Sequence, residues 1–121
     1  MTDNHPAQLL GVVIDCADPA ALAAFYQQAV GGQVTFNDGQ YAVLEGGPIE
    51  LLFQRVVGYR PPAWPGDAKH AHLDLKVAAL DTAAKALVEL GATLPEHQPG
   101  GGDWLVLQDP EGHLFCITTG H

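Results

Sequence analysis

The chain carries the same order of sequence patterns twice. Residues 9–31 run from an apolar stretch through an Asp-Pro pair into an amphipathic segment that ends at a glycine, and residues 70–91 repeat most of that order. Short strand-like segments follow each copy. Two units of this kind can face each other and frame one cleft. The repeat therefore predicts two related halves, each of which points side chains into a shared site.

Local signals place the elements of the first half. The Val/Ile-rich stretch Leu9–Asp15 is typical of a strand. Asp18 is a good N-cap, Pro19 is favoured as a first helical residue, and apolar residues then recur at helical spacing until Gly31. Breaks at Asn-Asp-Gly and Gly-Gly-Pro separate the segments that follow. We expect strands over residues 33–36, 41–45 and 49–55.

The second half repeats the plan. His70–Val77 alternates polar and apolar residues, which indicates a strand, and Asp81–Leu90 has helical periodicity. Ala79 occupies the position that corresponds to Asp18 of the first half, and alanine has no side-chain acceptor, so we expect this helix to lack a side-chain cap. Strands are expected over residues 92–94, 104–108 and 113–118.

The combined pattern is βαβββ twice, which predicts an α+β fold. We expect two modules that form a curved, partly open mixed sheet barrel around a cleft, with the helices on its outer face. At 121 residues the chain is expected to form one domain. Module one covers about residues 9–55, a loop covers 56–69, and module two covers about 70–118.

Composition excludes several classes of function. The net charge of −9 would repel a phosphate backbone, so neither nucleic acid nor an anionic membrane is an expected partner. The chain contains no serine, which excludes serine-nucleophile hydrolases. No apolar run approaches the ~20 residues of a membrane span, and the first residues do not resemble a signal peptide. We therefore expect a cytoplasmic protein.

The loop between the halves is rich in proline, which excludes a regular element, and it contains Tyr59, Arg60 and Trp64. Two interpretations are equally supported. The loop either tucks its aromatic rings onto the domain or covers the cleft.

The chain resembles the vicinal oxygen chelate superfamily in four segments: IDCADPAALAAFYQQAVGG, LLFQRVVGYRPPAWPG, HLDLKVAALDTAAKALVELGATL and WLVLQDPEGHLFCI. This superfamily includes glyoxalase I, extradiol dioxygenases and bleomycin-resistance proteins. The most similar branch is the small glyoxalase-like proteins common in actinobacteria. The resemblance covers roughly Leu9–Thr118 and implies the paired-module fold. It leaves function open, because the superfamily contains both metal-dependent enzymes and metal-free binding proteins.

The resemblance also implies where metal ligands would lie, one on the first and one on the last strand of each module. In module one, the first position is seven residues before Asp18 and is Gly11, which has no donor atom. The last-strand position is Glu50.

In module two, the first-strand position is His72. The last-strand position, four residues after Gly112, is Cys116 where glutamate is usual. Glu50 and His72 are therefore the candidate ligands for a divalent metal ion (zinc, nickel or manganese), and a Cys116 thiolate could be a third ligand for zinc.

Each candidate has a structural alternative. Glu50 shares its strand face with Leu52 and Gln54 and could be a solvated carboxylate. His72 could form a hydrogen bond with Asp74 on its own strand instead of binding a metal. Cys116 could simply pack as a small apolar residue.

Three readings of the function remain open from the sequence. In the first, the protein is a lyase or isomerase in which Glu50 and His72 carry the chemistry. They either hold a metal ion or act without one, with His72 as general acid/base and Glu50 orienting it. In the second, the protein binds and sequesters a small molecule without turnover, as bleomycin-resistance proteins do. A third reading is a non-enzymatic accessory domain.

Both versions of the enzyme, with and without a metal ion, need a dry cleft, and the protein is expected to form a homodimer. The residues expected to bind the small molecule are Leu52, Gln54, Tyr59, Trp64 and Cys116.

Overall fold

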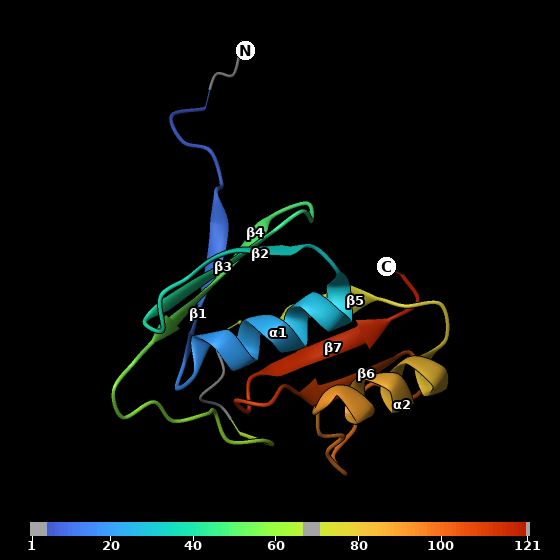
Figure 1. The fold of residues 1–121 in the computed structure, drawn as a ribbon. Coiled ribbons are helices and arrows are strands. Elements are labelled where there is room, and N and C mark those ends of the chain that lie inside the picture. Colours follow the sequence, from blue (N-terminus) through green and yellow to red (C-terminus); the bar gives the residue numbers. More distant parts are fainter. Residues whose placement is uncertain (1–4, 67–70, 121) are drawn as a thin grey trace.

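The computed structural model describes residues 5–66 and 71–120 (Figure 1). The α+β class and the two βαβββ-like modules are confirmed. The first module contains β1 (Gly11–Cys16), α1 (Pro19–Val30), β2 (Gln33–Asn37), β3 (Tyr41–Glu45) and β4 (Glu50–Arg55). The second contains β5 (Leu73–Lys76), α2 (Leu80–Leu90), β6 (Trp104–Gln108) and β7 (Leu114–Thr118).

The second module differs from the first at its second strand. The strand expected over residues 92–94 is reduced to a single bridge, in which Thr93 and Gln108 exchange backbone hydrogen bonds of 2.8 Å. Pro95 follows immediately and has no N–H to continue a ladder. The expected strand over His70–Val77 is likewise shorter, and His70 itself lies outside the described residues.

The two modules share one strand arrangement. The first sheet has the order β1-β4-β3-β2, and the second has the order β5-β7-β6. In each sheet the first strand of the module pairs in parallel with its last strand, β1 with β4 and β5 with β7. The repeat in the sequence therefore corresponds to a repeat in strand pairing.

The helix α1 begins as the sequence predicts. The Asp18 side chain accepts a hydrogen bond of 3.2 Å from the Ala21 N–H, and Pro19 is the first helical residue. The helix α2 begins at Leu80, and its N-cap residue Ala79 provides no side-chain hydrogen bond, again as expected. Among residues 5–66 and 71–120, neither helix has the length and hydrophobicity of a membrane span.

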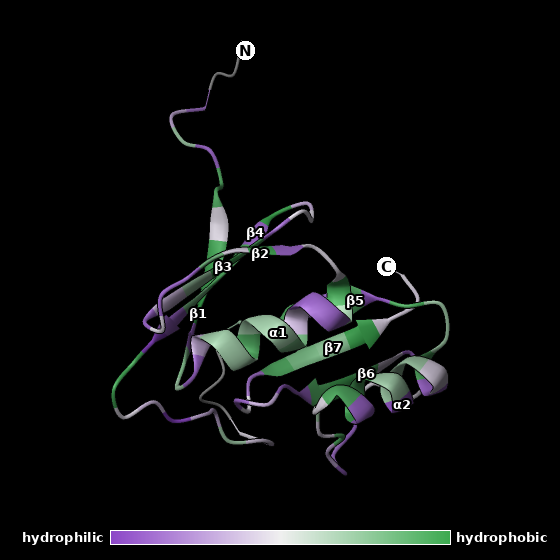
Figure 2. Cartoon of the chain, in the orientation of Figure 1, coloured by the Kyte–Doolittle hydropathy of each residue, from purple (hydrophilic) through white to green (hydrophobic). Residues whose placement is uncertain are grey.

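Helix α1 packs on β2, β3 and β4 of the four-stranded sheet and contacts β7 of the three-stranded sheet through its aromatic side chains (Figure 1). The Tyr26 ring on α1 stacks on Phe53 of β4, with 5.7 Å between ring centroids, and meets Phe115 of β7 edge-on at 6.3 Å. All three side chains are buried. Figure 2 shows hydrophobic stretches along β6 and β7, and hydrophilic stretches in turns and on part of α1.

This packing decides which way each sheet presents its other side chains. Because successive residues of a strand point to opposite faces, the neighbours of Phe53 and Phe115 point away from α1. We call these two surfaces the outer face of the four-stranded sheet and the outer face of the three-stranded sheet. The two outer faces belong to different sheets, so candidate residues on one face are not strand neighbours of those on the other.

A buried hydrogen bond also joins the two modules. The Tyr26 hydroxyl donates to Asp109 Oδ2 at 2.7 Å, and Asp109 Oδ1 accepts from the backbone N–H groups of Glu111 and His113. Burial raises the pKa of the Asp109 carboxyl above its usual value, while the bond from Tyr26 acts in the opposite direction. The bond attaches the turn between β6 and β7 to α1.

Replacing Tyr26 by phenylalanine is expected to lower the free energy of unfolding by ~1–3 kcal/mol near neutral pH, because the buried carboxylate loses a donor. The loss should shrink as the pH falls through the folded-state pKa of Asp109, since a protonated carboxyl needs that donor less. Denaturant titrations at neutral and acidic pH measure both effects. Tyr41→Phe on β3 is the matched control, and an equal loss there, or a loss that grows in acid, would contradict the assignment.

Candidate functional site

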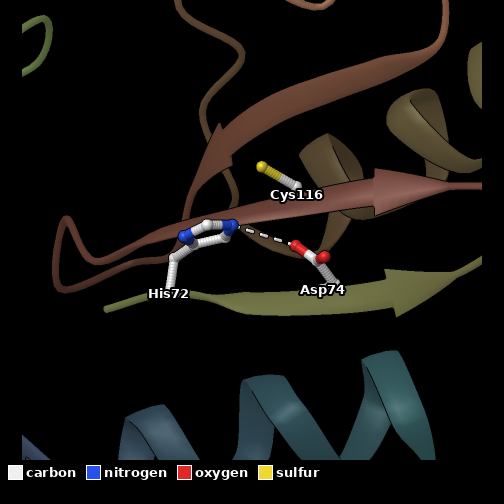
Figure 3. Close-up of side chains that lie close together, drawn as sticks. All are labelled: His72, Asp74 and Cys116. Carbon is white, nitrogen blue, oxygen red and sulfur yellow. Dashed lines mark ion pairs between the residues drawn. The ribbon is translucent and has the colours of Figure 1, made fainter. Parts of the chain in front are cut away.

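The outer face of the three-stranded sheet brings together His72, Asp74 and Cys116 (Figure 3). His72 and Asp74 lie two residues apart around the inward-facing Leu73, so they share a face. Asp74 is paired in register with Cys116 on the neighbouring strand β7. One donor atom from each of the three side chains lies within 4.8 Å of the other two.

The imidazole of His72 is oriented by a carboxylate. Its Nε2 lies 3.0 Å from Asp74 Oδ1, while the two side chains remain 35% and 40% exposed. An exposed pair of this kind adds little to stability, but it holds the ring in one orientation. This is the contact along the strand that the sequence offered as the alternative to metal binding by His72.

A cavity of about 740 Å³ opens beside these three residues. Its walls are largely apolar, and they include both tryptophans of the chain, Trp64 and Trp104. The other described residues that line it are Pro99, Gly102, Asp103, Val106, Leu114, Thr118, Thr119 and Gly120. The cavity therefore combines apolar walls with one polar patch.

The segment of residues 95–103 covers part of this face. The Gln98 side-chain amide pairs with β6 as a strand would, since it donates to the Val106 carbonyl at 2.9 Å and accepts from its N–H at 2.8 Å. A β-carbon on Gly100 would collide with the carbonyl and ring of Trp104, so the close passage over that side chain requires glycine. No sequence pattern indicated this cover.

Trp64 comes from the loop between the modules and packs on the segment of residues 95–103. Its Nε1–H donates to the His97 carbonyl at 3.2 Å, and the two rings lie 5.5 Å apart. Tyr59, in the same loop, lies elsewhere. Its ring packs 5.2 Å from His113, and its hydroxyl donates to the Glu111 carbonyl at 2.9 Å. Of the loop's two candidate residues, the structure thus places only Trp64 in the cavity wall.

The remaining candidates lie on the other sheet. Glu50, Leu52 and Gln54 occupy alternate positions of β4, on the outer face of the four-stranded sheet. They are not among the described residues that line the cavity. The structure thus brings His72, Cys116 and Trp64 together, and it does not bring Glu50, Leu52, Gln54 or Tyr59 to them within one chain.

The four-ligand metal set implied by the resemblance does not fit one chain. A β-carbon on Gly11 would lie 2.7 Å from the Leu52 side chain and 2.9 Å from the Glu50 carbonyl oxygen, so no donor side chain fits there. Glu50 lies on the outer face of the other sheet. The ligand set predicted from the sequence did not include Asp74. The two-residue spacing between His72 and Asp74 was the pattern that could have indicated it, because it places both side chains on one face.

The sequence profile of the glyoxalase-like domain family matches residues 11–118, which span every element described above. The chain belongs to the glyoxalase-like family. This family is part of the vicinal oxygen chelate superfamily, which also contains bleomycin-resistance proteins and dioxygenases. None of the curated proteins matches the chain in sequence.

Several solved structures share the fold of this glyoxalase-like chain. A glyoxalase-related enzyme from Fulvimarina pelagi is 24% identical, with a TM-score of 0.65 over 92% of this chain and 86% of that one. A glyoxalase/bleomycin resistance protein/dioxygenase family enzyme from Burkholderia phytofirmans PsJN is also 24% identical, with a TM-score of 0.69 over 92% and 97%. The bleomycin-binding protein of Streptomyces verticillus, complexed with copper(II)-bleomycin, is 20% identical, with a TM-score of 0.58 over 95% and 99%.

The two cysteines of this glyoxalase-like protein should differ in reactivity. Cys16 is fully buried, and burial, reinforced by the negative charge of Glu111, raises the pKa of its thiol to about 11. Cys116 is half-buried in the cavity wall. Iodoacetamide applied to the folded protein should therefore modify Cys116 first, as measured by peptide mass spectrometry. Faster modification of Cys16 would contradict this arrangement.

Proposed function

We propose that this glyoxalase-like protein binds a small oxygen-bearing molecule in the cavity on the outer face of the three-stranded sheet. The observation that carries the proposal is the cavity of about 740 Å³ with two indoles in its walls and the His72–Asp74–Cys116 patch at one end. Ligand sites typically have about this size and combine apolar walls with a few polar groups. The indoles would contact the apolar part of the molecule, and the patch would bind its oxygens.

A second copy of the chain would supply the opposite wall. A row of apolar side chains crosses the outer face of the four-stranded sheet in the register Val13, Leu52, Val43, Phe36. Val13 and Phe36, at its two ends, are each 50% exposed. An apolar row across a solvated sheet face is typical of an interface, and in a two-fold dimer the same contact forms twice.

Such a homodimer would also bring candidate residues of the two sheets together at one cavity. Glu50 and Gln54 flank the apolar row on the same outer face, so they would approach the cavity of the partner. For the lyase or isomerase function, His72 would then act as general acid/base with its ring held by Asp74. Glu50 from the second copy would carry out the second proton-transfer step.

The alternative function is sequestration without turnover. Two observations favour it: both tryptophans lie in the cavity wall, and the net charge of −9 would attract a cationic molecule. The similar protein from Streptomyces verticillus is described as bleomycin-binding. A cationic aromatic drug is therefore the ligand class to test against small hydroxy and keto acids.

Intrinsic fluorescence offers a direct binding experiment, because both tryptophans of the chain line the cavity. We expect either copper(II)-bleomycin or a panel of small 2-hydroxy and 2-keto acids to produce a saturable change, with a matching rise in Tm. His72→Ala should abolish binding and any turnover while the protein stays folded. Glu89→Gln on the exposed side of α2 is the control. Equal binding by His72→Ala, or an unfolded variant, would count against the site.

The dimer has its own experiment. Sedimentation velocity should give a dimer for the natural chain and a monomer for Val13→Asp, because a charge in the apolar row would be desolvated on association. Val88→Asp on α2 is the matched control, since Val88 is similarly exposed at 44% but lies on neither outer face. A monomeric natural chain, or an equal effect of the two variants, would refute the proposed wall.

A further inference from the structure

We infer that His72, Asp74 and Cys116 form a zinc site whose three protein ligands all come from the second module. The inference goes beyond the proposed cleft, because it needs neither Glu50 nor a second copy. Only the action of the ion on a bound molecule rests on the proposed function. The supporting observations are the donor set, its geometry, its charge and its place in the cavity.

The donor set suits zinc rather than a hard cation. An imidazole nitrogen, a carboxylate oxygen and a thiolate sulfur are all common zinc ligands, whereas magnesium and calcium prefer all-oxygen shells. Tetrahedral zinc with bonds of about 2.0–2.3 Å separates its ligand atoms by about 3.2–3.8 Å. The observed separations, 3.0 Å between His72 and Asp74 and no more than 4.8 Å within the set, need only small side-chain rotations to reach that geometry.

The backbone holds these ligands in place. Asp74 and Cys116 are register partners on the hydrogen-bonded strands β5 and β7, and His72 is two residues from Asp74 on the same face. Ligands on neighbouring strands, as Asp74 and Cys116 are, are positioned more accurately than ligands on loops, and His72 directly precedes β5. The arrangement favours chelation over a proton relay, because Asp74 and Cys116 lie beyond the same edge of the imidazole (Figure 3). A relay would place them at opposite nitrogens.

Charge at the site also favours a cation. A bound zinc ion would neutralise both a carboxylate and a thiolate at this end of the cavity. No lysine or arginine is among the described residues that line the cavity. The net charge of −9 further raises the local concentration of cations.

Three protein ligands leave the fourth tetrahedral position open, as in catalytic zinc sites. The triad lies in the wall of the cavity, so that position would be accessible to water or to an oxygen of a bound molecule. This site differs from the four-ligand set implied by the family resemblance, because it replaces Gly11 and Glu50 with Asp74. Asp74 and Glu50 therefore separate the two possibilities experimentally.

The test uses metal ions alone. The tag-free, chelator-treated full chain is titrated with zinc by calorimetry and with cobalt(II) by visible absorption. We expect one equivalent per chain and a thiolate-to-cobalt charge-transfer band. Cys116→Ala should abolish the band and Asp74→Asn should weaken zinc binding by about tenfold or more, while Cys16→Ala and Glu50→Gln should leave both unchanged. Circular dichroism checks that each variant is folded.

Two results would overturn the inference. One is the absence of stoichiometric zinc binding by the natural chain. The other is binding that Glu50→Gln abolishes and Asp74→Asn preserves, which would identify a site built from both modules. Because this readout contains no small molecule and the fluorescence experiment contains no added zinc, failure of the zinc site is distinguishable from failure of the proposed cleft.

Discussion

Tyr26 connects the two halves of the molecule. Its ring contacts Phe53 on one sheet and Phe115 on the other, and its hydroxyl donates to the buried Asp109 in the turn between β6 and β7. Helix α1 therefore contacts the core of both sheets, and α2 also packs on β6 and β7. Because a strand alternates its side chains, burying Phe53 and Phe115 against α1 forces their neighbours outward, onto the outer faces of two different sheets. The distribution of the candidate residues follows from this packing.

The consequence for function is a divided site. His72, Asp74 and Cys116 gather on one outer face beside a cavity, while Glu50 and Gln54 occupy the other with an exposed apolar row between them. Gly11 reinforces the division, since β4 passes too close for any side chain at that position. Under the proposed function, chemistry that uses Glu50 together with His72 requires a second copy of the chain, whereas an ion held by the triad does not.

The sequence predicted part of this site because alternation along a strand is local. The spacing of His72 and Asp74 placed them on one face, and the structure shows them 3.0 Å apart. The approach of Cys116 to that pair was implied by the family resemblance and by no local pattern, because it depends on the register of β5 against β7, which are separated by about forty residues of chain. The cavity cover is equally non-local, since Gln98 pairs with Val106 through a side chain rather than through a strand.

The sequence by itself determined the repeated module, the capped start of α1, the uncapped start of α2 and most strand positions. These features follow from residues a few positions apart, through capping, turn chemistry and periodicity. Only the tertiary structure decided that α1 contacts both sheets, that Glu50 lies outside the cavity lined by His72, and that Asp74 meets Cys116. Those outcomes depend on which apolar faces pack together, and no local pattern specifies the partner of a buried face.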